Sequence, residues 1–133
     1  MKYLDEYAEH YADCAWLGFE ELEAFMVDAL KASGVPASDA AIIGDVLIES
    51  DKRGIDSHGI GRLKPIYIDR IDIGIMNPVT EIEVVKDQDA TAVLDGHNGM
   101  GHVVGHKAME MAIEKAKRYG MGMVVVRNSN HYG

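Results

Sequence analysis

A histidine and an arginine four residues apart carry the clearest chemical signal in this sequence. His58 and Arg62 lie in the run 51–63, where a polar, glycine-containing stretch interrupts a helical pattern. If a helix restarts near Ser57, His58 lies in its first turn and Arg62 lies one turn later on the same face. The free N–H groups and the positive dipole end of that helix would favour a neutral imidazole and would attract anions.

These two side chains suit a small acid as their ligand. A guanidinium can hold a carboxylate through two parallel hydrogen bonds, and an imidazole can pass a proton near neutral pH. The pair therefore predicts oxidation or reduction at the carbon next to a carboxylate. The alternative is local capping, in which Ser57 or Asp56 caps the helix and Arg62 pairs with a surface acid such as Asp51. Capping would be the favoured interpretation if the pair stood alone.

The segment 128–133 is a second candidate site. It follows an apolar strand and offers amide and hydroxyl groups together with the imidazole of His131. Ligands of open α/β sheets bind outside the carboxyl ends of the strands, which is where this segment begins. A polar turn without a ligand is an equally good interpretation of the segment taken alone.

Two other patterns imitate known sites. The run 99–105 has glycines in the spacing G-x-G-x-x-x-G, and the following strand does not end near the acid that a standard Rossmann site uses to bind ribose. We expect these glycines to allow a tight loop and close helix packing. His102 and His106 are four apart on a helix, but no carboxylate shares their spacing. We expect two partly exposed histidines and no metal site.

Composition excludes several classes of protein. The chain has 133 residues, of which 47% are hydrophobic and 26% charged, as is ordinary for a globular domain. Its formal net charge of -9 argues against binding to nucleic acid or to anionic membranes. The lone cysteine, Cys14, fits a reducing compartment. With neither a membrane-length apolar run nor the layout of a secretory signal, the sequence predicts a soluble cytoplasmic protein.

The first 78 residues predict three helices that position the His/Arg pair. The first covers 19–30 and is ended by Gly34 and Pro36, and the second begins near Ser38 or Asp39 and stops near residue 53. The third covers about 59–73, with Pro65 in its second turn at the latest. Before them, Tyr3, Tyr7 and Tyr11 have the spacing of a helical arm packed on the body.

The pattern then changes to strands and a helix. We expect strands at 82–85 and 91–95, a loop at 96–101, a helix at 104–119 with Gly120 as its C-cap, and a strand at 123–127. The last three elements form a right-handed βαβ unit if their strands are parallel. The last strand is apolar throughout, which predicts burial on both faces. We therefore expect residues 1–133 to be part of a larger fold, completed by further sequence or by another chain.

In combination, these motifs closely resemble one family. It is the malate/L-lactate dehydrogenase family of the sulfolactate dehydrogenase type, which is unrelated to the Rossmann-fold lactate and malate dehydrogenases and includes ureidoglycolate dehydrogenase and diketogulonate reductase. The resemblance covers about residues 19–133. The motifs that carry it are the run 51–59, Arg62-Leu63, Tyr67 with Arg70 and Gly74, Val93-Leu94-Asp95-Gly96 with Asn98-Gly99 and Gly101, and the run 128–133.

The resemblance implies an oxidoreductase that depends on NAD or NADP. It would interconvert a 2-hydroxy acid, similar to malate or lactate, and its 2-keto acid by hydride transfer, and it would be a homodimer. By resemblance, His58 with Ser57 beside it is catalytic and Arg62 binds the substrate carboxylate. His131 would lie near the nicotinamide and is the catalytic base in some members. The resemblance places the cofactor on residues 130–133, which are Asn130, His131, Tyr132 and Gly133.

The resemblance also implies an organisation into two parts. Residues 1–78 form an N-terminal helical segment carrying the substrate-site residues, and residues 79–133 begin the α/β cofactor-binding domain of a non-Rossmann NAD(P)-binding fold. Family members are more than twice as long, so most of the cofactor site and the acid that orients the catalytic histidine would lie beyond Gly133. The alternative is a non-catalytic helical interaction module that needs a partner chain.

Overall fold

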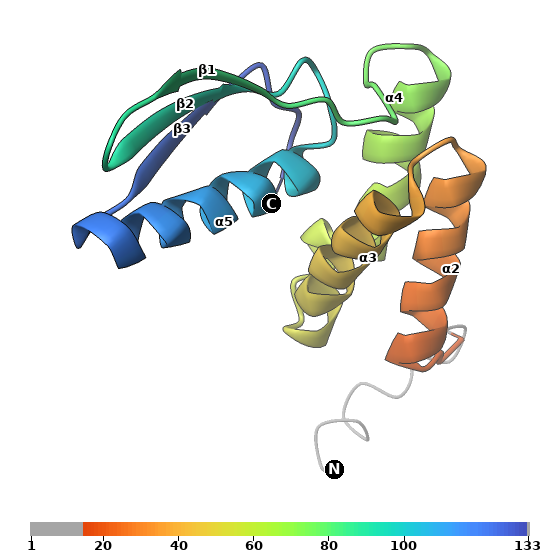
Figure 1. Cartoon of the computed structure of the whole chain (residues 1–133). Helices are drawn as coiled ribbons and strands as arrows, with labels where there is room; N and C mark the ends of the chain where they lie inside the picture. Colours follow the sequence, from red (N-terminus) through yellow and green to blue (C-terminus); the bar gives the residue numbers. More distant parts are fainter. Residues whose placement is uncertain (1–14, 133) are drawn as a thin grey trace.

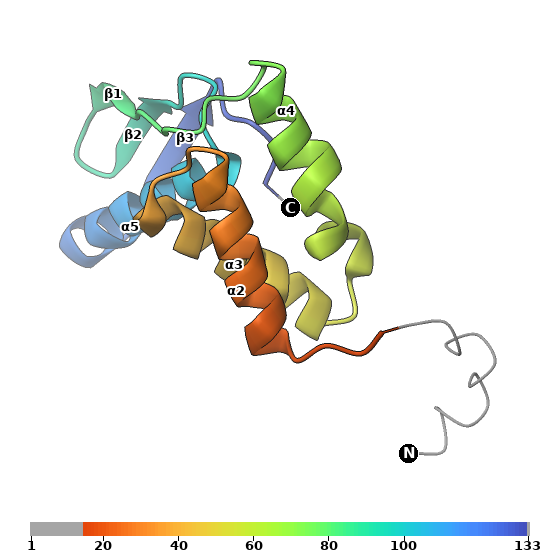
Figure 2. The same ribbon diagram turned by 90° about the vertical axis from the view of Figure 1, so that its right-hand side faces the viewer.

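A computed structural model describes residues 15–132 of the chain. The predicted tyrosine arm and Gly133 lie outside the described residues. A helical part comes first and a small sheet with one long helix follows, which confirms the predicted mixed α/β class (Figure 1). The segment 128–132 enters the space between these two parts in both ribbon views (Figure 2).

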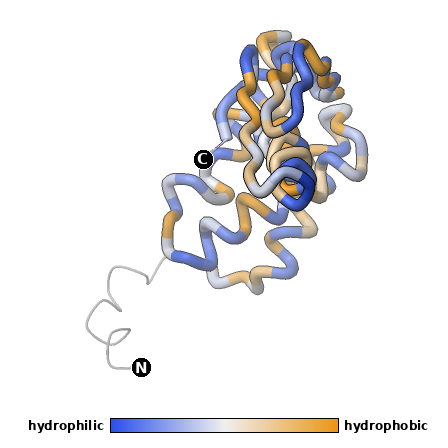
Figure 3. Tube along the Cα trace, turned by 60° about the vertical axis from the view of Figure 1, so that its left-hand side comes forward, coloured by the Kyte–Doolittle hydropathy of each residue, from blue (hydrophilic) through white to orange (hydrophobic). Residues whose placement is uncertain are grey.

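The first two helices pack against each other through their apolar faces. Helix α2 (Phe19–Ala32) is ended by Gly34, whose φ of 90° is a conformation that favours glycine. Helix α3 (Ala37–Lys52) begins before the predicted caps, because Pro36 fixes a suitable φ and its carbonyl accepts the first helical bond, from Ala40. The prediction of Ser38 or Asp39 as N-cap was therefore wrong. Hydrophobic and hydrophilic residues alternate along the helical trace, as expected for amphipathic helices (Figure 3).

The predicted third helix is not one continuous helix. Two short 3₁₀ turns at Asp56–His58 and Ile60–Arg62 lead into a π-helical turn at Leu63–Ile68, and only α4 (Asp69–Asp72) is α-helical. Pro65 lies inside the π turn and lacks the N–H that an α-helix would use at this point. The apolar spacing of this stretch predicted a helical conformation but could not separate α from 3₁₀ or π geometry.

The sheet has three strands in the order β1-β2-β3 among the described residues. Strand β1 (Glu83–Asp87) pairs antiparallel with β2 (Thr91–Asp95), and β2 pairs in parallel with β3 (Met123–Arg127), in register from Thr91↔Met123 to Asp95↔Arg127. Helix α5 (Gly101–Tyr119) connects β2 to β3 and ends at Gly120, as predicted. The parallel pairing confirms the predicted βαβ unit.

Two details of this unit differ from prediction. Helix α5 begins three residues before the predicted start, and a hydrogen bond from the N–H of Met100 to the Thr80 hydroxyl, 3.1 Å long, anchors the residue before its first turn. Strand β3 is not buried on both faces, since Met123 and Val125 are about half exposed. The reason is topological, because β3 lies at the edge of the described sheet and α5 packs only against the opposite face.

One hydrophobic core joins the helical part to α5. It contains side chains from α2 and α3, the π turn, the following loop and the start of α5, and this continuity fixes residues 56–62 relative to the sheet. No helix in the described part of the chain combines the length and apolar character of a membrane span. The fully buried members of the core are Met26, Leu30, Ala40, Ile43, Leu47, Ile48, Tyr67, Met76 and Met100.

Candidate active site

The two candidate sites of the sequence meet in one place. The imidazole rings of His58 and His131 are stacked, with their centroids 6.0 Å apart and an interplanar angle of 29°. His58 and Arg62 are half-buried, whereas His131 is exposed, so a small ligand can reach the group from solvent. The structure therefore places two imidazoles beside a guanidinium at the boundary between the helical part and the sheet.

Neighbouring groups hold the side chains of His58 and Arg62. The hydroxyl of Ser57 lies 2.9 Å from Nδ1 of His58, and Nε of Arg62 donates to the backbone carbonyl of Ser57. In this arrangement Nε2 of His58 and the outer nitrogens of Arg62 remain available to a ligand. The dipole argument of the sequence does not apply, because a three-residue 3₁₀ turn replaces the expected helix start. The surface ion pair that the alternative capping interpretation gave to Arg62, with Asp51 or Asp56, is not formed among the described residues, and Nε of Arg62 bonds to the Ser57 carbonyl instead.

Asp51 has a different task from the one that the capping interpretation assigned to it. Its Oδ2 accepts a hydrogen bond from the backbone N–H of Ile60, 2.8 Å long, and so fixes the turn between His58 and Arg62. The same carboxylate fills the space beside Gly59, where a Cβ would lie 1.8 Å from Oδ1. A Cβ at this position would displace the Asp51 carboxylate, so glycine preserves the hydrogen bond from the N–H of Ile60 to Asp51.

The loop after β2 holds the segment of His131 in place. The amide nitrogen of Asn130 donates to the backbone carbonyl and side-chain oxygen of Asn98, at 2.7 and 2.9 Å. A Cβ on Gly101 would lie 2.3 Å from the carbonyl oxygen of Asn130 and 2.5 Å from that of His131. These contacts confirm that the glycines of the run 99–105 serve close packing.

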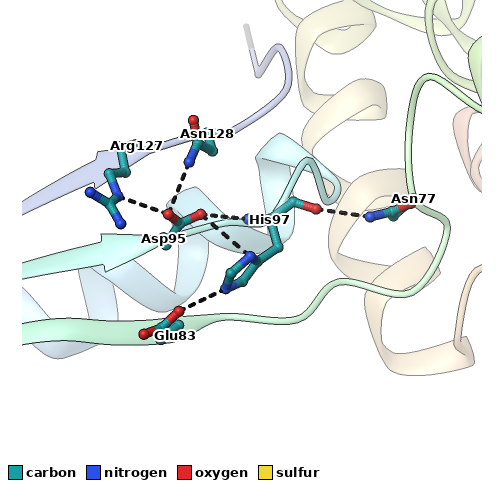
Figure 4. A network of polar contacts seen from close by, with 6 residues as sticks. All are labelled: Asn77, Glu83, Asp95, His97, Arg127 and Asn128. Atoms are coloured by element: carbon teal, nitrogen blue, oxygen red, sulfur yellow. Dashed lines mark hydrogen bonds and ion pairs between the residues drawn. The ribbon is translucent and has the colours of Figure 1, made fainter.

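A buried carboxylate ties the ends of β2 and β3 together just before this segment (Figure 4). Asp95 accepts hydrogen bonds from the backbone N–H of His97, from Nε of Arg127 and from the amide of Asn128, at 3.0, 2.7 and 2.9 Å. The bond from His97 is the largest cause that lowers the pKa of Asp95, and the bonds from Arg127 and Asn128 add to it. Asn128 takes a φ of 52°, which turns the chain from β3 toward the site.

A tyrosine connects His131 to a second, buried histidine. The hydroxyl of Tyr67 lies 3.3 Å from Nδ1 of His131 and 3.5 Å from Nε2 of His102. Tyr67 and His102 are 1% and 4% exposed, so the expectation of a partly exposed His102 was wrong. The helix face that was assigned to solvent instead packs against the π turn. His106, one turn later, is exposed and lies 3.4 Å from Glu110.

The electrostatics favour the uncharged forms of His102 and His131. Burial, with a smaller contribution from His131, lowers the pKa of His102 to about 4. The pKa of His131 is lowered first by partial burial and then by Arg62, His58 and Arg70. Burial raises the pKa of Tyr67 to about 12, so its hydroxyl keeps its proton at any physiological pH.

An open groove of ≈ 550 Å³ extends from the site between α5 and β3. Its lining includes His102, His106 and Tyr132, together with apolar side chains of α5 and β3 and Val46 of α3. The Tyr132 ring packs where a Cβ of Gly105 would come within 3.3 Å.

Reasoning from the sequence did not identify three of the groups that position the site. Tyr67 was identified only as an inward-facing helical residue, and His102 was assigned to the helix surface. Asn98, which receives the amide of Asn130, was treated as part of a loop. A signal for Tyr67 existed, because a phenol facing the core needs a polar partner. The partner itself, 35 residues later, could not be named from spacing.

Comparison with known proteins places these features in a family. The family model described as malate/L-lactate dehydrogenase matches residues 17–133. An L-sulfolactate dehydrogenase of Methanocaldococcus jannaschii is 50% identical over 114 residues, which cover 86% of this chain and 33% of that protein. A malate dehydrogenase of Pyrococcus abyssi is also 50% identical over 114 residues, covering 86% of this chain and 31% of the relative.

A solved structure agrees with the sequence comparisons. The crystal structure of malate dehydrogenase from Entamoeba histolytica superposes with a TM-score of 0.86 at 49% identity, covering 88% of this chain and 32% of that one. The chain thus spans about a third of the length of the relatives that it matches.

Proposed function

Because the chain belongs to the malate/L-lactate dehydrogenase family, we propose that it carries the proton-transferring and carboxylate-binding residues of an NAD- or NADP-dependent 2-hydroxy acid dehydrogenase. The substrate class is a 2-hydroxy acid similar to malate or lactate, together with its 2-keto acid. One observation carries the proposal, namely that His58 and His131 are stacked beside Arg62, at 6.0 Å between ring centroids.

His58 is the proton carrier of this proposal. In the oxidation, Nε2 of His58 takes the proton of the substrate hydroxyl, and in the reduction it returns that proton to the oxygen of the former carbonyl. Ser57 keeps the ring oriented through Nδ1, at 2.9 Å, so that Nε2 faces the ligand. When bound, the nicotinamide supplies or accepts the hydride.

Arg62 binds the substrate carboxylate. Its outer nitrogens can donate two parallel hydrogen bonds to the carboxylate while Nε remains bonded to the Ser57 carbonyl. Fixing the carboxylate orients the neighbouring carbon, which is the reacting one. The cofactor ring would be held by residues of the segment 130–133, of which Asn130, His131 and Tyr132 are described and Gly133 is not.

Three further properties belong to the same proposal. The boundary near residue 78 divides a helical substrate-side part from an α/β cofactor-side part, and the fact that every described strand follows residue 78 supports it. A homodimer is supported by large exposed apolar side chains, among them Phe25 on α2 and Met109 on α5. A cytoplasmic location is supported by the single cysteine.

The chain spans about a third of the length of its relatives, so the test is a turnover assay of a full-length enzyme that contains this chain, with malate, lactate and sulfolactate, each with NAD and with NADP. We expect one cofactor and at least one of these acids to give a steady increase in reduced nicotinamide, and a 2-hydroxy acid ester to give none. Equal turnover of the acid and its ester would contradict the proposal, and so would the absence of turnover with every 2-hydroxy acid.

A further inference from the structure

The buried contact chain from His102 through Tyr67 to His131 has no part in the proposed steps. Tyr67 belongs to the π turn, His102 to the first turn of α5 and His131 to the segment after β3, so three elements converge on one hydroxyl. Nδ1 of His102 is buried and has no hydrogen-bond partner among the described residues. This unpartnered atom restricts where the imidazole protons of His102 and His131 and the hydroxyl proton of Tyr67 can lie.

A single hydroxyl proton limits the choice to three arrangements. In the first, Nε2–H of His102 donates to Tyr67, and Tyr67 donates to Nδ1 of His131. In the second, the direction is reversed, so that Nδ1–H of His131 donates to Tyr67, and Tyr67 donates to Nε2 of His102. In the third, both rings donate to the oxygen, and the hydroxyl proton of a side chain that is 1% exposed is left without an acceptor.

The orphaned atom of His102 distinguishes the first two arrangements. The reversed direction places the His102 proton on Nδ1, where a buried N–H would have nothing to donate to. The first direction leaves only a lone pair at that atom. Buried N–H groups without an acceptor are rarer in protein interiors than buried acceptors without a donor. Each such N–H group loses its hydrogen bonds to water without gaining another, which destabilises the fold.

We propose that Tyr67 and His102 are positioning residues that hold His131 neutral, with its proton on Nε2, so that His131 donates a hydrogen bond to the ligand and His58 alone carries the reacting proton. The assignment of these roles rests on the proposed function. Protonation of His131 at Nδ1 would require the Tyr67 hydroxyl to reverse, and His102 would then have to move its own proton to the orphaned Nδ1.

The charged surroundings of His131 act in the same direction. Arg62, Arg70 and His58 face it from the helical part, and Tyr67 contacts it from the π turn. Partial burial and the positive groups lower the pKa of His131, and burial keeps Tyr67 protonated. A hydrogen bond received by the neutral form adds to this effect, because it must be broken before the ring is charged.

Nitrogen-15 NMR of the histidines in the purified enzyme tests the proposal directly, because the two tautomers of an imidazole give different ring-nitrogen shifts. We expect both His102 and His131 to carry their proton on Nε2 at neutral pH. A proton on Nδ1 of either ring would overturn the proposed direction. This readout needs no turnover, so it is separate from any failure of the proposed function, which the activity assay reports.

Two pairs of variants test the link between the residues. In Tyr67→Phe we expect the pKa of His131 to rise toward its ordinary value and kcat/KM to fall by about three- to tenfold, the usual effect of one lost hydrogen bond. The matched control is Tyr119→Phe, which removes an exposed hydroxyl at the far end of α5 and should change neither. An unchanged His131 pKa in Tyr67→Phe would overturn the proposal.

Two variants test the role of His102 as a hydrogen-bond donor, one that keeps an N–H group at this position and one that removes it. His102→Gln keeps an amide N–H for Tyr67 and should retain the pKa of His131, whereas His102→Leu should raise it. The thermal midpoint of each variant separates this effect from misfolding. If Gln and Leu shifted the pKa of His131 equally, a donor at position 102 would have no role and the proposal would be overturned.

Discussion

His58 and His131 share one stacked arrangement, with 6.0 Å between their ring centroids, although they come from different parts of the fold. His58 is one of the positive groups that lower the pKa of His131, after partial burial and Arg62. The arrangement therefore disfavours a positive charge on His131, which agrees with the proposal that His58 alone carries the reacting proton.

Removal of the proton carrier should abolish most of the activity and leave the fold intact. In His58→Ala we expect kcat to fall by about 10²–10⁴, the range for loss of a general acid–base. His97→Ala removes an exposed imidazole from the loop after β2 and serves as the control for nonspecific loss of a histidine. Turnover near the wild-type value in His58→Ala would transfer the role to His131, and His131→Ala should then show the large loss.

Arg62→Lys should weaken substrate binding much more than it slows the reaction. Lysine has one ammonium group and cannot bond the Ser57 carbonyl while it holds a carboxylate through two bonds. We expect KM for the 2-hydroxy acid to rise roughly 10- to 100-fold, the effect of a lost charged hydrogen bond. Arg53→Lys, in which the arginine pairs only with Glu49 at the surface, is the matched control. Equal kinetic constants for both variants would contradict the carboxylate role.

Gly101→Ala should displace the segment of His131. The added methyl group would lie 2.3 Å from one backbone oxygen and 2.5 Å from another, and neither can move as a flexible side chain would. We expect a loss of about 1–3 kcal/mol in the free energy of unfolding, typical of overpacking, together with a reduced kcat. Gly18→Ala, where nothing lies within 4 Å, is the control, and denaturant titration of both variants makes the comparison. A Gly101→Ala enzyme with normal stability would refute the close packing.

Acid should destabilise the protein through His102. Burial lowers the pKa of this group from 6.5 to about 4, so the unfolded chain binds its proton first as the pH falls. The stability is complete above pH 6.5 and is lost as the pH falls toward 4, by about 3 kcal/mol at pH 4. His102→Gln should flatten this part of the stability profile, and His106→Gln, on the exposed side of α5, should not. Identical profiles for both variants would show that His102 is not responsible.

The 133-residue chain by itself should bind the cofactor weakly or not at all and should associate. Strand β3 pairs only with β2 among the described residues, and Met123 and Val125 are half exposed on it. An apolar edge of this kind pairs readily with another chain. Calorimetric titration with NADH and NADPH, combined with light scattering, provides the measurement. A stable monomer that binds either cofactor at micromolar strength would contradict this expectation.

Local patterns were sufficient to predict the elements with a single strong signal. The runs 91–95 and 123–127 match β2 and β3 without error, and Gly120 ends α5 in the left-handed conformation. The prediction of one continuous helix over residues 59–73 was wrong because the spacing of apolar residues is nearly the same in α and π geometry. The prediction that His102 is partly exposed was wrong because its burial depends on Tyr67, a partner that only the tertiary fold brings near.

The sequence indicated the candidate side chains of the site but not the groups that hold them in place. The types of His58 and Arg62 and their proximity in sequence were enough to indicate acid chemistry, and the position of His131 after a strand was enough to make it a candidate. That the two groups are neighbours follows from the packing of the helical part on α5, which no local spacing encodes. The contacts of Asn98 and Gly101 with the segment 128–132 are of the same long-range kind.

The π turn at Leu63–Ile68 is the part of this stretch that best tolerates a change in chain length. A π turn accommodates one residue more than an α turn, and each residue of an α-helix rotates the chain by about 100°. Deletion of a single residue such as Lys64 would let the turn relax to α geometry and would keep Tyr67 close to its present direction. The same deletion within α5 would rotate every later side chain of that helix by about 100°.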